Sequence, residues 1–92
     1  TIFFMITIYS KEYCPYCDMA KNLIKSLWFE YFEIDVTSSP DIVLEISEIS
    51  WFRTVPQIFV WEIKKENCLG WYSDIKKLHD ENKLLTILEN NK

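Results

Sequence analysis

The tetrapeptide Cys14-Pro15-Tyr16-Cys17 places two thiols three residues apart, shortly after an apolar, β-branched run at residues 6–9 (ITIY). Apolar residues then recur at helical spacing, which predicts that a helix begins at Pro15. The first sulfur would lie at the helix N-terminus, where free N–H groups and the helix dipole favour an anion. We therefore predict that Cys14 is a nucleophilic thiolate and that Cys17, on the same helical face, forms a reversible disulfide with it.

The size and charge of the chain limit the classes of protein to which it can belong. Its 92 residues are 49% hydrophobic and 26% charged, which predicts one globular domain over residues 1–92. The order of its elements, given below, predicts that this domain is of the α/β class. The net charge of −4 argues against nucleic acid as a partner. No run of about 18 apolar residues is present, so we expect no membrane partner. We also expect Met5 to be the natural start, with residues 1–4 a remnant of expression or an upstream extension.

Cysteine usage indicates the compartment. Three cysteines in 92 residues are too few for a disulfide-stabilised scaffold, and one close pair plus Cys68 favours a reducing, cytoplasmic location. Cys68 itself is expected to be a buried, small apolar residue. Cys14, Cys17, Cys68 and His79 would suffice in number for tetrahedral zinc, but a second close pair is missing, so we predict no metal site.

Hydrophobic periodicity predicts the order β-α-β-α-β-β-α with a short helical segment at the C-terminal end. Strands are expected at residues 6–9, 31–36, 57–61 and 68–69, and helices at residues 15–28, 40–50, 72–78 and 83–88. This order implies a mixed sheet with helices on both faces and right-handed crossovers.

The chain is rich in aromatic residues, which make up 16% of it. We expect its four tryptophans, Trp28, Trp51, Trp61 and Trp71, to lie mostly in the core. Trp51 with Phe52 is the exception, because an exposed pair there would form a docking surface for protein substrates.

Four segments together resemble the glutaredoxins in order and spacing: residues 9–11 (YSK), residues 14–17 (CPYC), residues 54–59 (TVPQIF), and Gly70 followed by Asp74. The resemblance covers nearly the whole chain. It implies a thioredoxin-like fold, a four-stranded mixed sheet flanked by helices. It also implies glutathione as co-substrate for thiol–disulfide exchange, no bound cofactor, and protein disulfides as substrates, with ribonucleotide reductase a plausible client.

The resemblance also implies a glutathione site. A lysine at position 11 contacts the glycine carboxylate in glutaredoxin-like sites, and its charge would also favour the Cys14 thiolate. Val55-Pro56 resembles the cis-proline step of the family, which would leave the Val55 backbone free to pair with an extended peptide beside Thr54. Two further groups complete the expected site: Tyr16 packing against the tripeptide, and Ser73 with Asp74 holding the γ-glutamyl end at a helix N-terminus.

Two departures leave alternatives open. Trp71 stands where the family usually has a second glycine, and Ser73 where an aspartate is common. Small redoxins that serve ribonucleotide reductase and are recycled by a flavoprotein reductase often have an aromatic residue after the glycine, but their dithiol is usually not CPYC. A [2Fe–2S] cluster shared across a dimer is a further alternative, against which Pro15 argues. We therefore expect a monomeric dithiol glutaredoxin.

Overall fold

Four strands form one mixed sheet in the computed structural model, which describes residues 6–90. The strands β1 (Ile6–Ser10), β2 (Phe32–Asp35), β3 (Gln57–Val60) and β4 (Cys68–Gly70) lie in the order β2-β1-β3-β4. β1 is parallel to β2 and antiparallel to β3, which is antiparallel to β4. The predicted four-stranded mixed sheet is confirmed, whereas the expected start at residue 5 and the extension before it lie outside the described residues.

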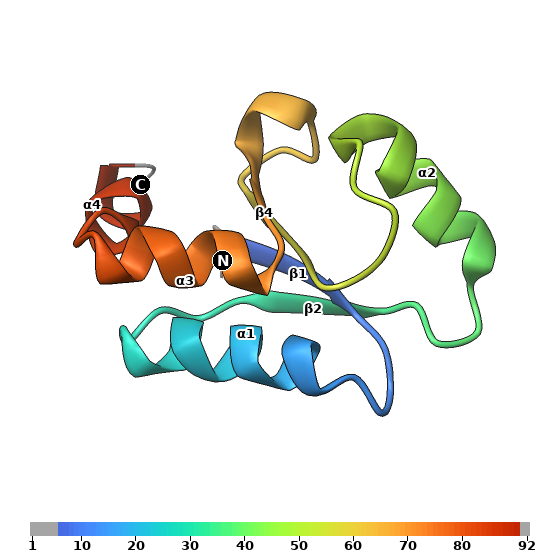
Figure 1. The fold of residues 1–92 in the computed structure, drawn as a ribbon. Coiled ribbons are helices and arrows are strands. Elements are labelled where there is room, and N and C mark those ends of the chain that lie inside the picture. The colour runs from blue at the N-terminus through green and yellow to red at the C-terminus, as the bar shows by residue number, and fades with distance from the viewer. Residues whose placement is uncertain (1–5, 91–92) are drawn as a thin grey trace, which may run out of the picture.

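The helices cover both faces of this sheet. They are α1 (Pro15–Ser26), α2 (Pro40–Ser50), α3 (Tyr72–Asp80) and α4 (Leu84–Asn90), with a 3-10 turn, η1, at Lys65–Asn67. α1 and α3 lie side by side on one face and α2 lies on the other (Figure 1). The order predicted from periodicity is therefore confirmed, including the short helix at the end.

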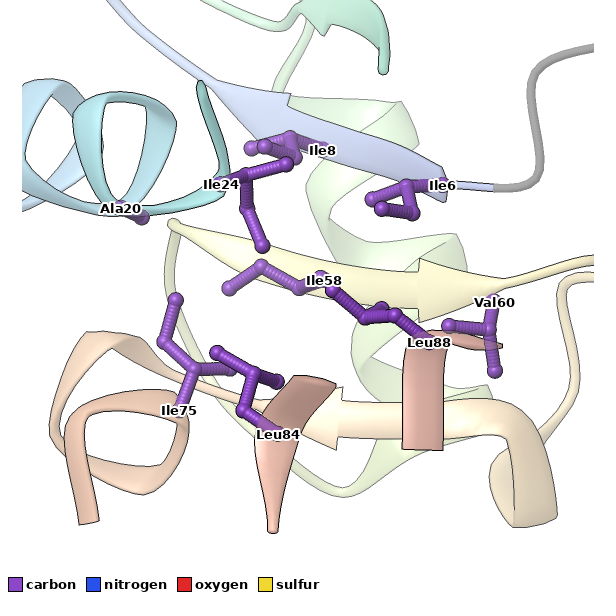
Figure 2. Packing of buried hydrophobic residues seen from close by; sticks show 9 residues of the cluster. All are labelled: Ile6, Ile8, Ala20, Ile24, Ile58, Val60, Ile75, Leu84 and Leu88. Carbon is purple, nitrogen blue, oxygen red and sulfur yellow. The ribbon is translucent and has the colours of Figure 1, made fainter. Parts of the chain in front are cut away.

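Alternate residues of the central strands face two separate apolar clusters, as the period of two in a strand requires. One cluster, shown in Figure 2, joins β1 and β3 to helices α1, α3 and α4; its fully buried members include Ile8, Ile24, Ile58 and Ile75. The other lies under α2 and includes Tyr9, Val36, Ile46 and Phe59. Both cysteines of the CPYC segment belong to this second cluster, so the dithiol is held by the core of the protein.

The expectation that the tryptophans lie mostly in the core is wrong. Trp28 is 94% exposed and Trp61 is exposed as well, whereas Trp51, the expected exception, is 76% exposed as predicted. Trp28, Trp51 and Trp61 have φ of 65°, 71° and 60°, the left-handed region that usually holds glycine where an element ends. The chain has a single glycine, and aromatic residues occupy these surface turns. Trp28 accordingly lies beyond α1, which ends at Ser26.

None of the helices found between residues 6 and 90 has the length and apolar character needed to cross a membrane.

Candidate active site

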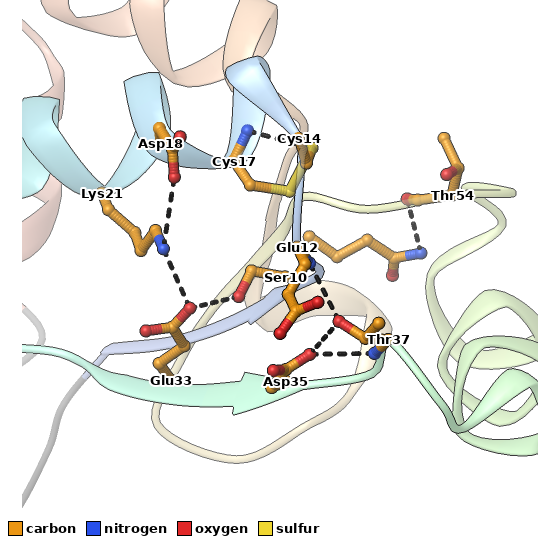
Figure 3. Close-up of a disulfide and its surroundings, with 11 residues drawn as sticks. Ser10, Glu12, Cys14, Cys17, Asp18, Lys21, Glu33, Asp35, Thr37 and Thr54 are labelled. Atoms are coloured by element: carbon orange, nitrogen blue, oxygen red, sulfur yellow. Dashed lines mark hydrogen bonds and ion pairs between the residues drawn. A yellow bond between two sulfur atoms is a disulfide. The ribbon is translucent and has the colours of Figure 1, made fainter.

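Cys14 and Cys17 form a disulfide at the start of α1, with their Cα atoms 5.2 Å apart. Cys14 is the N-cap residue of the helix, and its sulfur accepts a hydrogen bond of 3.2 Å from the backbone N–H of Cys17 (Figure 3). Pro15 at the first helical position has no N–H to leave unpaired. The Cys14 side chain is 8% exposed and that of Cys17 is fully buried. Solvent therefore reaches Cys14 and not Cys17.

A network of hydrogen bonds and ion pairs between polar side chains lies beside the start of α1. The buried hydroxyl of Ser10, at the end of β1, donates a hydrogen bond of 2.5 Å to Glu33 on β2, and Lys21 donates one of 2.9 Å to the same carboxylate oxygen (Figure 3). Lys21 also pairs with Asp18, the residue after Cys17, at 3.5 Å. The hydrogen bond from Ser10 is the main reason that the pKa of Glu33 is lowered, and the bond to Glu33 is the main reason that the pKa of Lys21 is raised. The sequence analysis did not predict this network because its residues come from three different elements.

The peptide bond between Val55 and Pro56 is cis, as predicted, and both residues are buried. Within residues 6–90, the backbone of Val55 makes no hydrogen bond to other backbone groups. Gln57 holds this segment: its buried amide donates to the carbonyl of Thr54 at 3.1 Å and accepts from the hydroxyl of Ser50 at 2.7 Å. The loop before the cis bond is thereby fixed to the end of α2, with a backbone edge free for a partner.

A cleft of about 360 Å³ separates this loop from the start of α3. Its lining brings together three residues predicted for the site, Thr54, Ser73 and Asp74, with Phe52, Arg53 and Trp71. One oxygen of Asp74 accepts a 2.8 Å hydrogen bond from the backbone N–H of Trp71, which caps α3. Gly70 has a φ of 98°, and a Cβ there would lie 2.7 Å from the same carboxylate oxygen, so this turn requires glycine.

Tyr16 and Lys11 have different surroundings. The Tyr16 ring packs against Trp71 with centroids 4.8 Å apart, and against Tyr72 at 6.1 Å. Lys11 is exposed and lines a second hollow, of about 480 Å³, together with residues of α2. The predicted site residues therefore divide into two groups: Thr54, Ser73 and Asp74 line one cleft, with Tyr16 packed against its wall residue Trp71, and Lys11 lines another hollow.

Cys68 is half-buried on β4, and burial is the main cause of the raised pKa of its thiol. It packs against the cluster that contains the dithiol. Within the part of the chain that the structure describes, no group of three or more His, Cys, Asp or Glu side chains is arranged to hold a metal ion.

Comparisons with known proteins agree with this geometry. The family model described as Glutaredoxin matches residues 6–62. A glutaredoxin from Neisseria meningitidis is 36% identical over 77 residues, which are 83% of this chain and 86% of the relative. A solved glutaredoxin from Brucella melitensis has a TM-score of 0.80 at 35% identity, covering 97% of this chain and 92% of that one.

A solved complex of buckwheat glutaredoxin with glutathione has a TM-score of 0.83 at 25% identity, covering 96% of this chain and 79% of that one. The family model matches more than half of the chain, and the fold and the CxxC spacing agree with it. The chain therefore belongs to the glutaredoxin family and is a thiol–disulfide oxidoreductase with a thioredoxin-like fold.

Proposed function

We propose that this protein uses glutathione to reduce protein disulfides and glutathione mixed disulfides through Cys14 and Cys17. The observation that carries the proposal is the asymmetric pair of sulfurs at the α1 N-terminus. Cys14 is reachable and capped by a backbone N–H, whereas Cys17 is buried behind it. The buckwheat relative solved with glutathione supports the choice of co-substrate.

In the proposed cycle the Cys14 thiolate attacks one sulfur of a substrate disulfide. A mixed disulfide forms, and the other substrate sulfur leaves as a thiolate that takes a proton from water. Cys17 then loses its proton and attacks the Cys14 sulfur, which releases the second substrate thiol and closes the Cys14–Cys17 disulfide. The N–H of Cys17 stabilises the Cys14 sulfur whenever it carries negative charge.

Two glutathione molecules restore the dithiol. The first, as thiolate, attacks the Cys14 sulfur, which forms a glutathione mixed disulfide and frees Cys17. The second attacks the glutathione sulfur of that mixed disulfide, so that oxidised glutathione leaves and the Cys14 thiolate is regenerated. Each turn moves two electrons from two glutathiones to one substrate disulfide, and no bound cofactor is needed.

We propose that the cysteine and glycine parts of glutathione lie along the Thr54-Val55-Pro56 segment. The free backbone edge of Val55 supports this, because an extended peptide can pair with it as a strand does. Lys11 would hold the glycine carboxylate from its exposed position, and Tyr16 would pack against the tripeptide.

The γ-glutamyl end would occupy the cleft at the start of α3. There the helix N-terminus and the Ser73 hydroxyl would hold the carboxylate, and the Asp74 oxygen that does not cap the helix would accept from the ammonium group. We further propose that the protein acts as a monomer in a reducing compartment such as the cytoplasm.

One observation favours a second candidate function, that of a redoxin recycled by a flavoprotein reductase that supplies electrons to ribonucleotide reductase. Trp71 lines the cleft proposed for the γ-glutamyl group and adds bulk to its wall. A cleft that admits glutathione poorly would leave a reductase as the source of electrons.

A recycling assay separates the two candidates. The oxidised protein is offered glutathione with glutathione reductase and NADPH, or a thioredoxin-type reductase with NADPH, and NADPH consumption with an added disulfide substrate is followed. We expect turnover with glutathione; turnover with the thioredoxin-type reductase alone would replace the first candidate by the second.

A substitution at the residue proposed to hold the glycine carboxylate of glutathione makes this assay more specific. Lys11→Gln should raise the KM for glutathione about 2- to 5-fold, the range expected for one exposed charge pair. Lys77→Gln, at an exposed lysine on α3, is the matched control and should leave the KM unchanged.

A further inference from the structure

The Tyr16–Trp71 ring pair joins the dithiol to the cleft. Tyr16 lies between the two cysteines and directly precedes Cys17. It is 48% exposed. Trp71 both packs against Tyr16, at 4.8 Å between centroids, and lines the cleft opposite Phe52 and Thr54. A substrate that extends from the disulfide into the cleft therefore passes along aromatic surface.

Stability alone does not account for Trp71. Its backbone is extended, with φ of −98° and ψ of −179°, which any residue adopts, and the hydrogen bond that it gives to Asp74 uses only the backbone N–H. Its indole N–H is buried and has no acceptor among the described residues, an arrangement that costs folding free energy. Large aromatic rings are enriched at recognition surfaces.

We propose that Trp71 is a specificity-determining residue, which selects disulfide substrates carrying an aromatic residue on the N-terminal side of the reacting cysteine. The proposal rests on the function proposed above, because the orientation of glutathione there places the N-terminal side of the cysteine toward α3. An aromatic substrate ring in the cleft gains contact with Trp71 and Phe52. Glutathione has no such ring and gains nothing from this wall.

The preference for an aromatic residue should depend on the side of the reacting cysteine on which that residue lies. A residue placed before the cysteine would approach the cleft between Thr54 and Ser73, whereas one placed after it would approach Lys11 and the hollow beside α2. An aromatic residue should therefore accelerate the reaction on one side of the cysteine only. A general affinity for apolar peptides would accelerate the reaction on both sides of the cysteine.

The test uses the reduced full-length protein and three symmetric disulfides of blocked peptides: acetyl-Gly-Gly-Cys-Gly-amide, acetyl-Gly-Phe-Cys-Gly-amide and acetyl-Gly-Cys-Phe-Gly-amide. The second-order rate constant for oxidation of the protein is measured in a single turnover. Glutathione is absent from this measurement, so failure of glutathione recycling and failure of the Trp71 proposal give separate results.

We expect the peptide with Phe before Cys to react about 3- to 10-fold faster than the glycine peptide, the range of one aromatic pair. The peptide with Phe after Cys should gain less than 2-fold. Trp71→Ala should reduce the first ratio to about 1, Trp71→Phe should keep most of it, and Trp28→Ala, at an exposed tryptophan beyond the other end of α1, should leave it unchanged.

Equal acceleration by Phe on both sides of the cysteine in the unmodified protein would overturn the proposal, as would no acceleration at all. These two outcomes need no variant to fold. A Trp71→Ala protein that keeps the full preference would overturn it too.

Discussion

The backbone N–H of Cys17 points at the sulfur of Cys14 over 3.2 Å, so the helix that carries the dithiol is capped by its own first cysteine. Ser, Thr, Asp and Asn usually fill this position, where a side-chain oxygen accepts from the first turn. A thiolate is a larger anion and gains from the same N–H groups and from the helix dipole. We therefore expect the cap that begins α1 also to activate the sulfur.

Exchange of each sulfur for oxygen should separate the two roles. Cys14→Ser should abolish both reduction of protein disulfides and reduction of glutathione mixed disulfides, because serine is no nucleophile at neutral pH. Cys17→Ser should keep the second reaction and lose the first, since only the first needs a resolving thiol. Turnover numbers for the two substrate types check this, with Cys68→Ser as the control that keeps both activities. Activity remaining in Cys14→Ser would assign the attack to another sulfur.

The bond from Ser10 to Glu33 should make part of the stability depend on pH. The pKa of Glu33 is lowered from its ordinary value of 4.5, chiefly by this bond. A carboxyl group with a depressed folded pKa stabilises the fold above its unfolded pKa, and this contribution is lost as the pH falls through the folded value. Ser10→Ala should therefore cost about 0.5–1 kcal/mol at pH 7, a low figure because the Glu33 side chain is 39% exposed.

Urea unfolding at pH 7 and at about pH 3.5 measures this difference. The cost of Ser10→Ala should shrink at the lower pH. Ser26→Ala removes a hydroxyl that donates to a backbone carbonyl, that of Leu23, and its cost should not change with pH. An equal cost of Ser10→Ala at both values would show that the carboxylate charge does not matter.

Trp28 should be a position where loss of a large side chain stabilises the protein. Its φ of 65° costs a non-glycine residue about 1–2 kcal/mol, and its side chain is almost fully exposed. Trp28→Gly should raise the free energy of unfolding by about 0.5–1 kcal/mol, because the greater freedom of glycine in the unfolded chain cancels part of the gain. Trp28→Ala keeps the strained backbone and should gain nothing. A destabilised Trp28→Gly protein would mean that the tryptophan ring makes contacts the structure lacks.

Gly70→Ala should damage the start of α3. The added Cβ would meet the Asp74 carboxylate at 2.7 Å, and a φ of 98° is strained for alanine. We expect a loss of about 1–3 kcal/mol in the free energy of unfolding. If the clash with Asp74 contributes, Gly70→Ala and Asp74→Ala together should cost less than the sum of the two single changes. Strict additivity would assign the whole loss to backbone strain.

Much of the fold follows from local pattern. The apolar, β-branched run in β1 and the helical spacing after Pro15 predicted the elements around the dithiol within two residues. The end of α1 was placed too late because an apolar Trp28 continues the helical pattern while its backbone turns left-handed. Residue type gave no sign of that turn, since glycine or asparagine is usual there.

The candidate site was predicted where one short segment carries the chemistry, as in residues 14–17 and the cis bond before Pro56. It was incomplete where residues meet only in the folded chain. The pairing of Tyr16 with Trp71 and the bond from Ser10 to Glu33 span 55 and 23 residues, and no periodicity links them. Trp71 stood out in sequence only as a residue where glycine was expected.

The claim on which the mechanism rests is that the sulfur of Cys14 is held as an anion by the start of α1. The pH dependence of iodoacetamide alkylation of the reduced protein, resolved by residue with mass spectrometry, tests it directly. We predict that Cys14 is alkylated with a midpoint below about 7.5, and Cys68 with a midpoint above that of free cysteine, because burial raises the pKa of the Cys68 thiol. A midpoint for Cys14 at or above about 8.5, the value of free cysteine, would contradict the account.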